Sequence, residues 1–145
     1  MNNDKDFLDM VKGLQRKIDR DEEKTYSTRV IKEYRNPVNF GFIEHPDATG
    51  QIKGPCNDTI RIDLKIKNNI IQDARFWTDG CGASLACGNM LMNMIKGKTL
   101  NDAQNNTALQ LLKTLNGLPD EHQHCAKLAV HTLHETIKNY FTKER

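Results

Sequence analysis

A regular alternation of apolar and charged residues in the middle of the chain does most to limit the folds available to it. Residues 60–66 read Ile-Arg-Ile-Asp-Leu-Lys-Ile, the period of two expected of a strand that buries one face. Asn68 and Asn69 follow. Asparagine tolerates the positive φ of a tight turn, so residues 70–78 predict the returning strand of a hairpin. Residues 50–53 predict a third strand beside it.

The period changes after residue 80, where apolar residues begin to recur at helical spacing. We expect a helix from there to Gly97, a short helical turn from Thr99, and a further helix that ends before Gly117. The clearest helical pattern covers residues 126–141, where apolar side chains form a broad stripe. A run of strands followed by a run of helices predicts an α+β fold, a small three-stranded antiparallel sheet packed against helices.

The first residues of the chain predict an extra, charged amphipathic helix. Apolar residues recur there at spacings of four, three and four, from Phe7 to Ile18. We expect this helix to dock on its own domain rather than on a partner. A second, short helix is expected to begin after Ser27, a good N-cap residue. The chain is therefore divided into a helical extension, residues 1–24, and one domain, residues 25–145.

Composition narrows the class of protein. The charged residues make up 28% of the 145 residues, but the net charge is only +2, which argues against a nucleic-acid-binding surface. No apolar run approaches the roughly 18 residues of a membrane span. Acidic residues near the start suit neither a secretory signal nor a transit peptide. We therefore expect a cytoplasmic protein, in a compartment where cysteines stay thiols unless a metal or catalysis uses them.

The cysteines are the candidate functional residues, and no two of them form a Cys-x-x-Cys pair. They are Cys56, Cys81, Cys87 and Cys125. Three lie at boundaries between predicted elements: Cys56 in a turn before the first hairpin strand, Cys81 between two glycines, and Cys125 at the start of the last helix. A helix start favours the thiolate, the form that binds metal and attacks sulfur. Thiolates select iron–sulfur clusters, zinc or copper(I), and Asp58 or His124 is placed in sequence to complete the coordination.

Three segments around these cysteines resemble one known family. They are residues 54–58 (Gly-Pro-Cys-Asn-Asp), 80–82 (Gly-Cys-Gly) and 124–129 (His-Cys-Ala-Lys-Leu-Ala). Together with matching flanks from Tyr26 to Tyr140, they are similar to the ligand motifs of the U-type iron–sulfur scaffold family, the IscU and NifU N-terminal-domain type. The resemblance implies a SufE/NifU-like fold and a non-enzymatic scaffold. Such a scaffold assembles a cluster from iron and desulfurase-derived persulfide sulfur, then transfers it to acceptor apoproteins.

The resemblance also implies roles for individual residues. Cys56, Cys81 and Cys125 match the cysteine ligands, and Asp58 and His124 match additional ligands of the cluster or metal. Cys125 also matches the thiol that accepts persulfide sulfur. The implied cargo is a [2Fe–2S] cluster, with zinc in the cluster-free form. The implied partners are a cysteine desulfurase, acceptor apoproteins and a second copy of the chain around a shared cluster. Tyr26 matches a tyrosine near the site.

The chain departs from the family pattern at several positions. Asn57 replaces a glycine, and asparagine takes the same left-handed conformation. Cys87 replaces a serine, and we expect it to be a buried small residue. Residues 118–122 lack the second proline and the lysine of the segment that bacterial relatives present to a heat-shock chaperone, so that hand-off is not favoured. His122 stands at the lysine's position. A contact with the metal region is the alternative there, and we expect a solvated side chain. His131 and His134 are expected on the surface.

Two other functions compete with the scaffold. The first is a zinc-dependent sulfur relay that accepts persulfide from a cysteine desulfurase. Relatives of that kind usually carry an insertion between the second and third motifs and lack the histidine before the last cysteine. The present chain has recognisable family segments in that gap and keeps His124, which favours the scaffold. The second is a thiol enzyme with His124 as the base for Cys125. It is disfavoured because adjacent residues at a helix start are expected to point in different directions.

Overall fold

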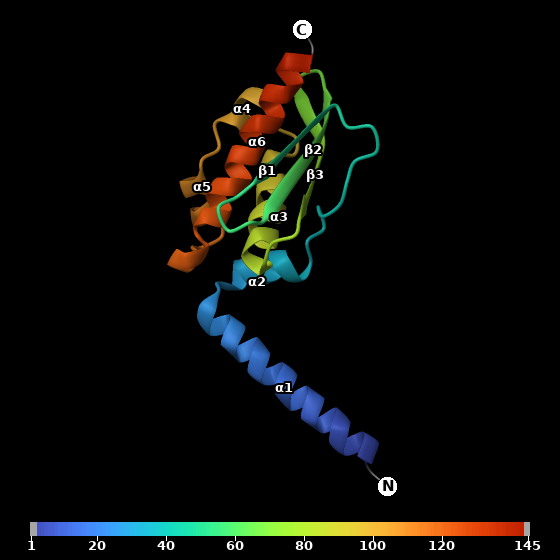
Figure 1. The fold of residues 1–145 in the computed structure, drawn as a ribbon, viewed down its shortest axis with the longest axis vertical. Coiled ribbons are helices and arrows are strands. Elements are labelled where there is room, and N and C mark those ends of the chain that lie inside the picture. The colour runs from blue at the N-terminus through green and yellow to red at the C-terminus, as the bar shows by residue number, and fades with distance from the viewer. Residues whose placement is uncertain (1–2, 144–145) are drawn as a thin grey trace.

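The structure is a computed structural model that describes residues 3–143 (Figure 1). Its elements, in chain order, are α1 (Asn3–Thr25), α2 (Thr28–Arg35), β1 (Ala48–Lys53), β2 (Thr59–Lys67), β3 (Ile70–Thr78), α3 (Gly82–Ile95), α4 (Leu100–Gln104), α5 (Ala108–Thr114), the 3-10 turn η1 (Asp120–His122) and α6 (His124–Lys143). The sequence-based boundaries agree with these bounds to within a few residues.

The strands form an antiparallel sheet in the order β1-β2-β3. Lys67 pairs with Ile70, so Asn68 and Asn69 alone form the hairpin loop. Their φ angles are 53° and 66°, the double left-handed conformation that matches the twist of the two strands. The prediction of a hairpin turned by two asparagines is confirmed.

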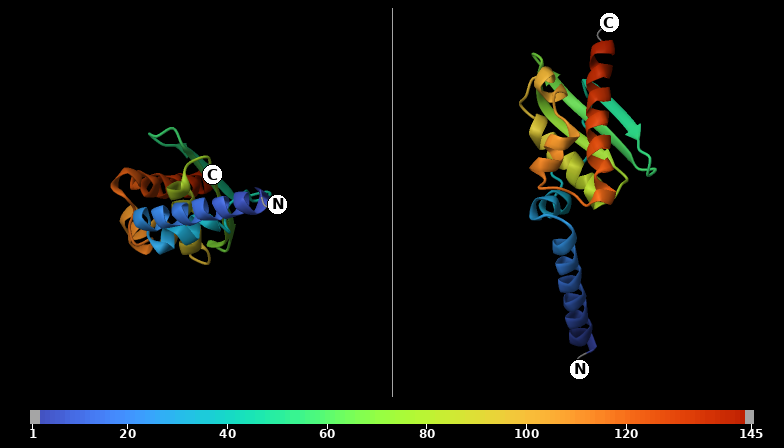
Figure 2. Two further views of the ribbon diagram at one scale, coloured as in Figure 1. Left: turned by 90° about the horizontal axis from the view of Figure 1, so that it is seen from below. Right: turned by 90° about the vertical axis from the view of Figure 1, so that its left-hand side faces the viewer.

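Helices α3 and α6 cover one face of this sheet, as Figure 1 and the right-hand view of Figure 2 show. Every second side chain of β2 points into the layer between the sheet and these helices. Ile60, Ile62 and Leu64 are completely buried there. Buried apolar residues of α3, α5 and α6 complete a single core. The predicted α+β architecture is confirmed, because the period-two face of the strands meets the apolar stripes of the helices in one layer.

Helix α2 is fixed beside α3 by a capping bond and by a buried polar network. Ser27 caps the helix as predicted, and its hydroxyl accepts a hydrogen bond from the Val30 N–H at 3.1 Å. The Asn89 side chain of α3 donates to Glu33, and its Oδ1 accepts from the Asn39 N–H at 2.9 Å. These bonds satisfy polar groups that would otherwise be costly to bury. They also fix the segment that carries Tyr26 and Tyr34.

Helix α1 stands away from the rest of the chain (Figures 1 and 2). The prediction of an amphipathic helix is confirmed, but the expectation that it docks on its own domain is wrong. Phe7, Leu14 and Ile18 are 60%, 55% and 51% exposed. Helical periodicity fixes which side chains share a face, and it carries no information on what covers that face. Among the described residues, none of the helices combines the length and apolar character needed to cross a membrane.

Candidate metal centre

The candidate site lies where several element ends meet. The loop before β2 brings Cys56 and Asp58, the start of α3 brings Cys81, and the start of α6 brings His124 and Cys125. A cavity of about 610 Å³ opens between them. Its lining includes two thiols, two imidazoles and three carboxylates: Cys56, Cys81, His122, His124, Asp58, Asp79 and Glu121. A cavity with this lining provides donors for a soft or borderline cation.

A tight turn aims the carboxylate of Asp58 into this cavity. The Asn57 N–H donates to the Gly54 carbonyl at 3.0 Å, and the Gly54 N–H donates to the Asp58 carbonyl at 2.7 Å. Asn57 has φ = 68°, the left-handed conformation expected for it from the sequence. Asparagine therefore keeps the turn, and both Cys56 and Asp58 line the cavity.

Cys81 is the N-cap residue of α3, and its carbonyl accepts the first helical bond, from the Leu85 N–H at 3.1 Å. The Cys81 sulfur is exposed and caps no backbone N–H of the helix. The preceding residue must be small. A Cβ on Gly80 would lie 2.5 Å from Ser84 Oγ and 3.1 Å from Asp58 Oδ2. Glycine thus lets the end of β3 approach the side chains at the base of the cavity.

Asp58, Ser84 and Cys125 form that base, which we call the floor of the site. Ser84 Oγ lies 3.1 Å from Asp58 Oδ2 and 3.5 Å from Cys125 Sγ, and its one proton serves one of them at a time. The second carboxylate oxygen, Asp58 Oδ1, is buried and has no hydrogen-bond partner among residues 3–143. An unpaired buried carboxylate oxygen is costly, and a bound cation would satisfy it.

The burial of Cys125 changes the chemistry expected of a thiol at a helix start. Its side chain is 1% exposed. Burial, with smaller contributions from the charges of Cys81 and Asp58, raises the pKa of the Cys125 thiol to about 11, although the Ser84 hydroxyl partly offsets this. The expectation that the helix start favours a Cys125 thiolate is therefore wrong for the metal-free site. A coordinated metal ion would reverse the balance, because it deprotonates a thiol ligand.

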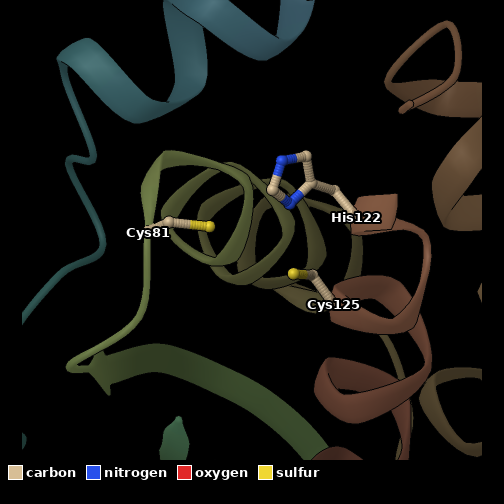
Figure 3. Close-up of side chains that lie close together, drawn as sticks. All are labelled: Cys81, His122 and Cys125. Atoms are coloured by element: carbon tan, nitrogen blue, oxygen red, sulfur yellow. The ribbon is translucent and has the colours of Figure 1, made fainter. Parts of the chain in front are cut away.

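Two groups of three potential ligands share the Cys125 sulfur. The first comprises Cys81, His122 and Cys125, and the second comprises Asp58, His124 and Cys125. Within each group the donor atoms all lie within 4.8 Å of one another. Figure 3 shows the side chains of the first group pointing toward a common point. His124 Nε2 lies 3.7 Å from Cys125 Sγ, so these neighbours do approach each other, contrary to expectation.

The structure brings together four of the five predicted site residues, the fifth being Cys56. Cys56 is exposed and lines the cavity but belongs to neither group. His122, expected to be solvated, is half-buried and belongs to the first group. Its place at the family's lysine position, two residues before His124, was the sequence signal for this role.

The remaining candidates lie beside or outside the site. The ring of Tyr26 lies 6.0 Å from that of His122 and 6.0 Å from that of Tyr34. Cys87 is completely buried, as expected, and burial raises the pKa of its thiol well above the ordinary value. His131 is exposed as expected. His134 is not, because its Nε2 is enclosed and has no hydrogen-bond partner among the described residues.

Comparison with known proteins gives relatives that cover most of the chain. An IscU iron–sulfur cluster assembly scaffold protein of Aquifex aeolicus is 38% identical over 122 residues, 82% of this chain and 78% of its own length. One of Archaeoglobus fulgidus is 40% identical over 119 residues, 81% and 78% of the two chains. One of Haemophilus influenzae is 35% identical over 124 residues, 82% of this chain and 98% of its own length.

Structural and profile comparisons agree with these relatives. The crystal structure of the N-terminal part of a nitrogen-fixing NifU-like protein from Brucella abortus superposes with a TM-score of 0.64. It is 18% identical, and the match covers 81% of this chain and 94% of that one. At that identity the likeness shows the fold alone. The profile of the NifU-like N terminal domain matches residues 25–145. With the similarity to the IscU proteins, this match shows that the chain belongs to the NifU-like N-terminal domain family.

Proposed function

We propose that this protein is a scaffold on which an iron–sulfur cluster is assembled and from which the cluster passes to acceptor apoproteins. The observation that carries the proposal is the convergence of thiols, imidazoles and a carboxylate on one open cavity. IscU relatives that span most of this chain are named as cluster assembly scaffolds. The activity is attributed to residues 25–145, with residues 1–24 as an extension.

The cluster is the cargo, and the residues of the site supply its ligands. Cys56, Cys81 and Cys125 provide three thiolates, and Asp58 or His124 provides a fourth donor. Four terminal donors, two for each iron, are what a [2Fe–2S] cluster requires. A second copy of the chain that shares the cluster would supply the fourth donor in a different way. An oxygen or nitrogen donor is a harder ligand than thiolate, so it makes the bound cluster easier to release.

Cys125 is proposed to accept sulfur from the persulfide of a cysteine desulfurase. The Cys125 thiolate attacks the outer sulfur of the persulfide, forms a new S–S bond and releases the desulfurase cysteine as a thiolate. The thiol must first lose its proton, and His124 Nε2, at 3.7 Å, is the base that lies beside it. The step is a transfer of sulfur between two thiols, and it needs no external oxidant.

Zinc is the second candidate cargo, because two thiolates with an imidazole or a carboxylate also form a good zinc site. In the scaffold hypothesis zinc occupies the cluster-free protein. In the alternative, the zinc-bound protein relays sulfur from a desulfurase and never holds a cluster. The two hypotheses share ligands and differ in what the site contains after it has received iron and sulfur.

The deciding experiment measures what the site contains after exposure to iron and sulfur. The protein is purified without oxygen and incubated with a cysteine desulfurase, cysteine and ferrous iron; iron, zinc and acid-labile sulfide are then measured with the visible spectrum. Equal iron and sulfide, a brown chromophore, and loss of both in Cys56→Ser and Cys125→Ser support the scaffold. Zinc that persists without any cluster would replace the scaffold with the zinc-dependent relay.

A further inference from the structure

The group formed by Cys81, His122 and Cys125 differs from the second group in its donor types. It offers two sulfurs and one imidazole nitrogen, whereas the second group offers one sulfur, one nitrogen and a carboxylate oxygen. Two thiolates balance the charge of a divalent cation. A borderline-soft ion such as zinc or ferrous iron prefers sulfur and nitrogen to oxygen. The first group is therefore the better site for a first metal ion.

The position of His122 is fixed by the turn that carries it. The backbone N–H of His122 donates to the Pro119 carbonyl at 2.9 Å and closes the 3-10 turn η1. The Gln123 side chain donates to the Leu118 carbonyl at 3.3 Å and braces the same turn. The ring of Tyr26 packs 6.0 Å from the imidazole. These contacts place the half-buried imidazole in the lining of the cavity.

The spacing of the three donors suits a tetrahedral ion after a small adjustment. With a Zn–S distance of about 2.3 Å and a Zn–N distance of about 2.0 Å, tetrahedral ligand atoms lie roughly 3.5–3.8 Å apart. The donors of this group already lie within 4.8 Å of one another. Cys81 is exposed and His122 is half-buried, so both side chains have room to move toward an ion.

We propose that His122 is a metal ligand of this protein and that Cys81, His122 and Cys125 bind the first divalent ion to enter the site. The fourth position of this ion faces the cavity, where Cys56 or a water completes the coordination. Asp58 and His124, which form the second group with Cys125, then remain as the donors for further loading. The inference deepens the proposed function, since it assigns the loading site of the same scaffold.

Cobalt(II) tests this assignment directly, because it replaces zinc and reports its ligands through its absorption. Metal-free protein is titrated with Co²⁺ without oxygen, and the charge-transfer and d–d bands are followed. His122→Ala is expected to raise the Kd at least about tenfold, the loss that even an outer-shell partner can cause. His131→Ala, a substitution of an exposed histidine on α6 outside both groups, is the matched control and leaves the titration unchanged.

A replacement ligand separates coordination from a structural role. His122→Cys is expected to restore tight binding and to raise the sulfur-to-cobalt charge-transfer intensity by roughly a third to a half, since one thiolate joins the two or three already bound. Wild-type affinity and an unchanged spectrum in His122→Ala would overturn the assignment. So would a His122→Cys protein that gains no charge-transfer intensity.

Cluster reconstitution in the same preparations keeps this inference distinct from the proposed function. If wild-type protein forms a cluster while His122→Ala binds cobalt normally, the assignment of His122 fails and the scaffold function stands. If His122→Ala and His122→Cys change cobalt binding as expected while wild-type protein forms no cluster, the assignment stands and the scaffold function fails.

Discussion

The site has two sides that differ in how its donors are held. On the floor, Cys125 is almost completely buried, and Ser84 lies within hydrogen-bond distance of both Asp58 and Cys125. The other donors, which we call the rim, are more exposed: Cys56 and Cys81 are exposed thiols, and His122 is half-buried on a short turn. Ser84 on α3 links the floor residues Asp58 and Cys125 to each other, while the rim residues are more exposed and have no such link in common.

This difference suits a protein that must bind a cluster and then give it up. A rigid donor that is buried in the core defines where the metal sits and costs little to reorganise. Exposed donors at the rim admit iron and sulfur and are accessible to an acceptor protein. We therefore expect changes to the floor to abolish binding and changes to the rim to alter its strength or its rate.

The largest effect is expected from removing the sulfur that both ligand groups share. Cys125→Ala takes one donor from each group, and we expect the Kd for Co²⁺ to rise at least about a hundredfold. Cys56→Ala removes a thiol that belongs to neither group and should weaken this first binding step much less. Anaerobic titration measures both. Equal losses of Co²⁺ affinity in the two variants would mean that the buried sulfur contributes no more to binding than an exposed one.

Thiol labelling in the metal-free protein compares the two sides in one experiment. At neutral pH, iodoacetamide should label Cys56 and Cys81 first and Cys125 at least about tenfold more slowly, because a buried, protonated thiol is a poor nucleophile. The pKa of Cys125 is raised to about 11, so its labelling should keep accelerating as the pH rises toward that value. Peptide mass spectrometry gives each rate. Labelling of Cys125 as fast as Cys81 would contradict the difference in burial.

The sequence predicted the fold well because its signals are local. The alternation over residues 60–66 requires only that neighbours face opposite sides of a strand, and Asn68 and Asn69 fix their own turn. The motifs of the site were equally visible, since each lies at a boundary between two recognisable patterns. Local order along the chain thus located the site and most of its donors.

The features of the site and of α1 that the sequence could not predict depend on packing between distant segments. A helix start favours a thiolate, but whether burial outweighs it at Cys125 depends on how α6 packs against α3 and the loop at Asp58. The role of His122 depends on the turn η1, which brings its imidazole within 4.8 Å of the Cys81 and Cys125 sulfurs. For the same reason the apolar stripe of α1 predicted a helix and could not predict that the helix stands free.

A pair of glycine substitutions tests how tightly the floor is packed. Gly80→Ala places a Cβ 2.5 Å from Ser84 Oγ, which cannot retreat without leaving Asp58 and Cys125, so we expect a loss of about 1–3 kcal/mol in unfolding free energy. Gly82→Ala, two residues further on, places its Cβ no nearer than 3.4 Å to its closest neighbour, the Tyr34 ring, and should change stability by less than about 0.5 kcal/mol. Urea denaturation of the metal-free variants measures the difference. Similar losses of stability in both variants would show that the close packing of Gly80 against Ser84 does not require a glycine.

The smallest expected effect concerns the release of the cluster. Among the proposed ligands, Asp58 offers the oxygen donor, and the others offer sulfur or nitrogen. Asp58→Ala removes the hard oxygen donor, and we expect the bound cluster to persist severalfold longer because the remaining ligands exchange more slowly. Decay of the visible chromophore in the presence of a chelator measures this lifetime. Glu121→Ala, which removes an exposed carboxylate from the same cavity, controls for the change in charge and should decay like the wild type. Unchanged decay in Asp58→Ala would remove this role from the carboxylate, and faster decay would mean that the carboxylate holds the cluster in place.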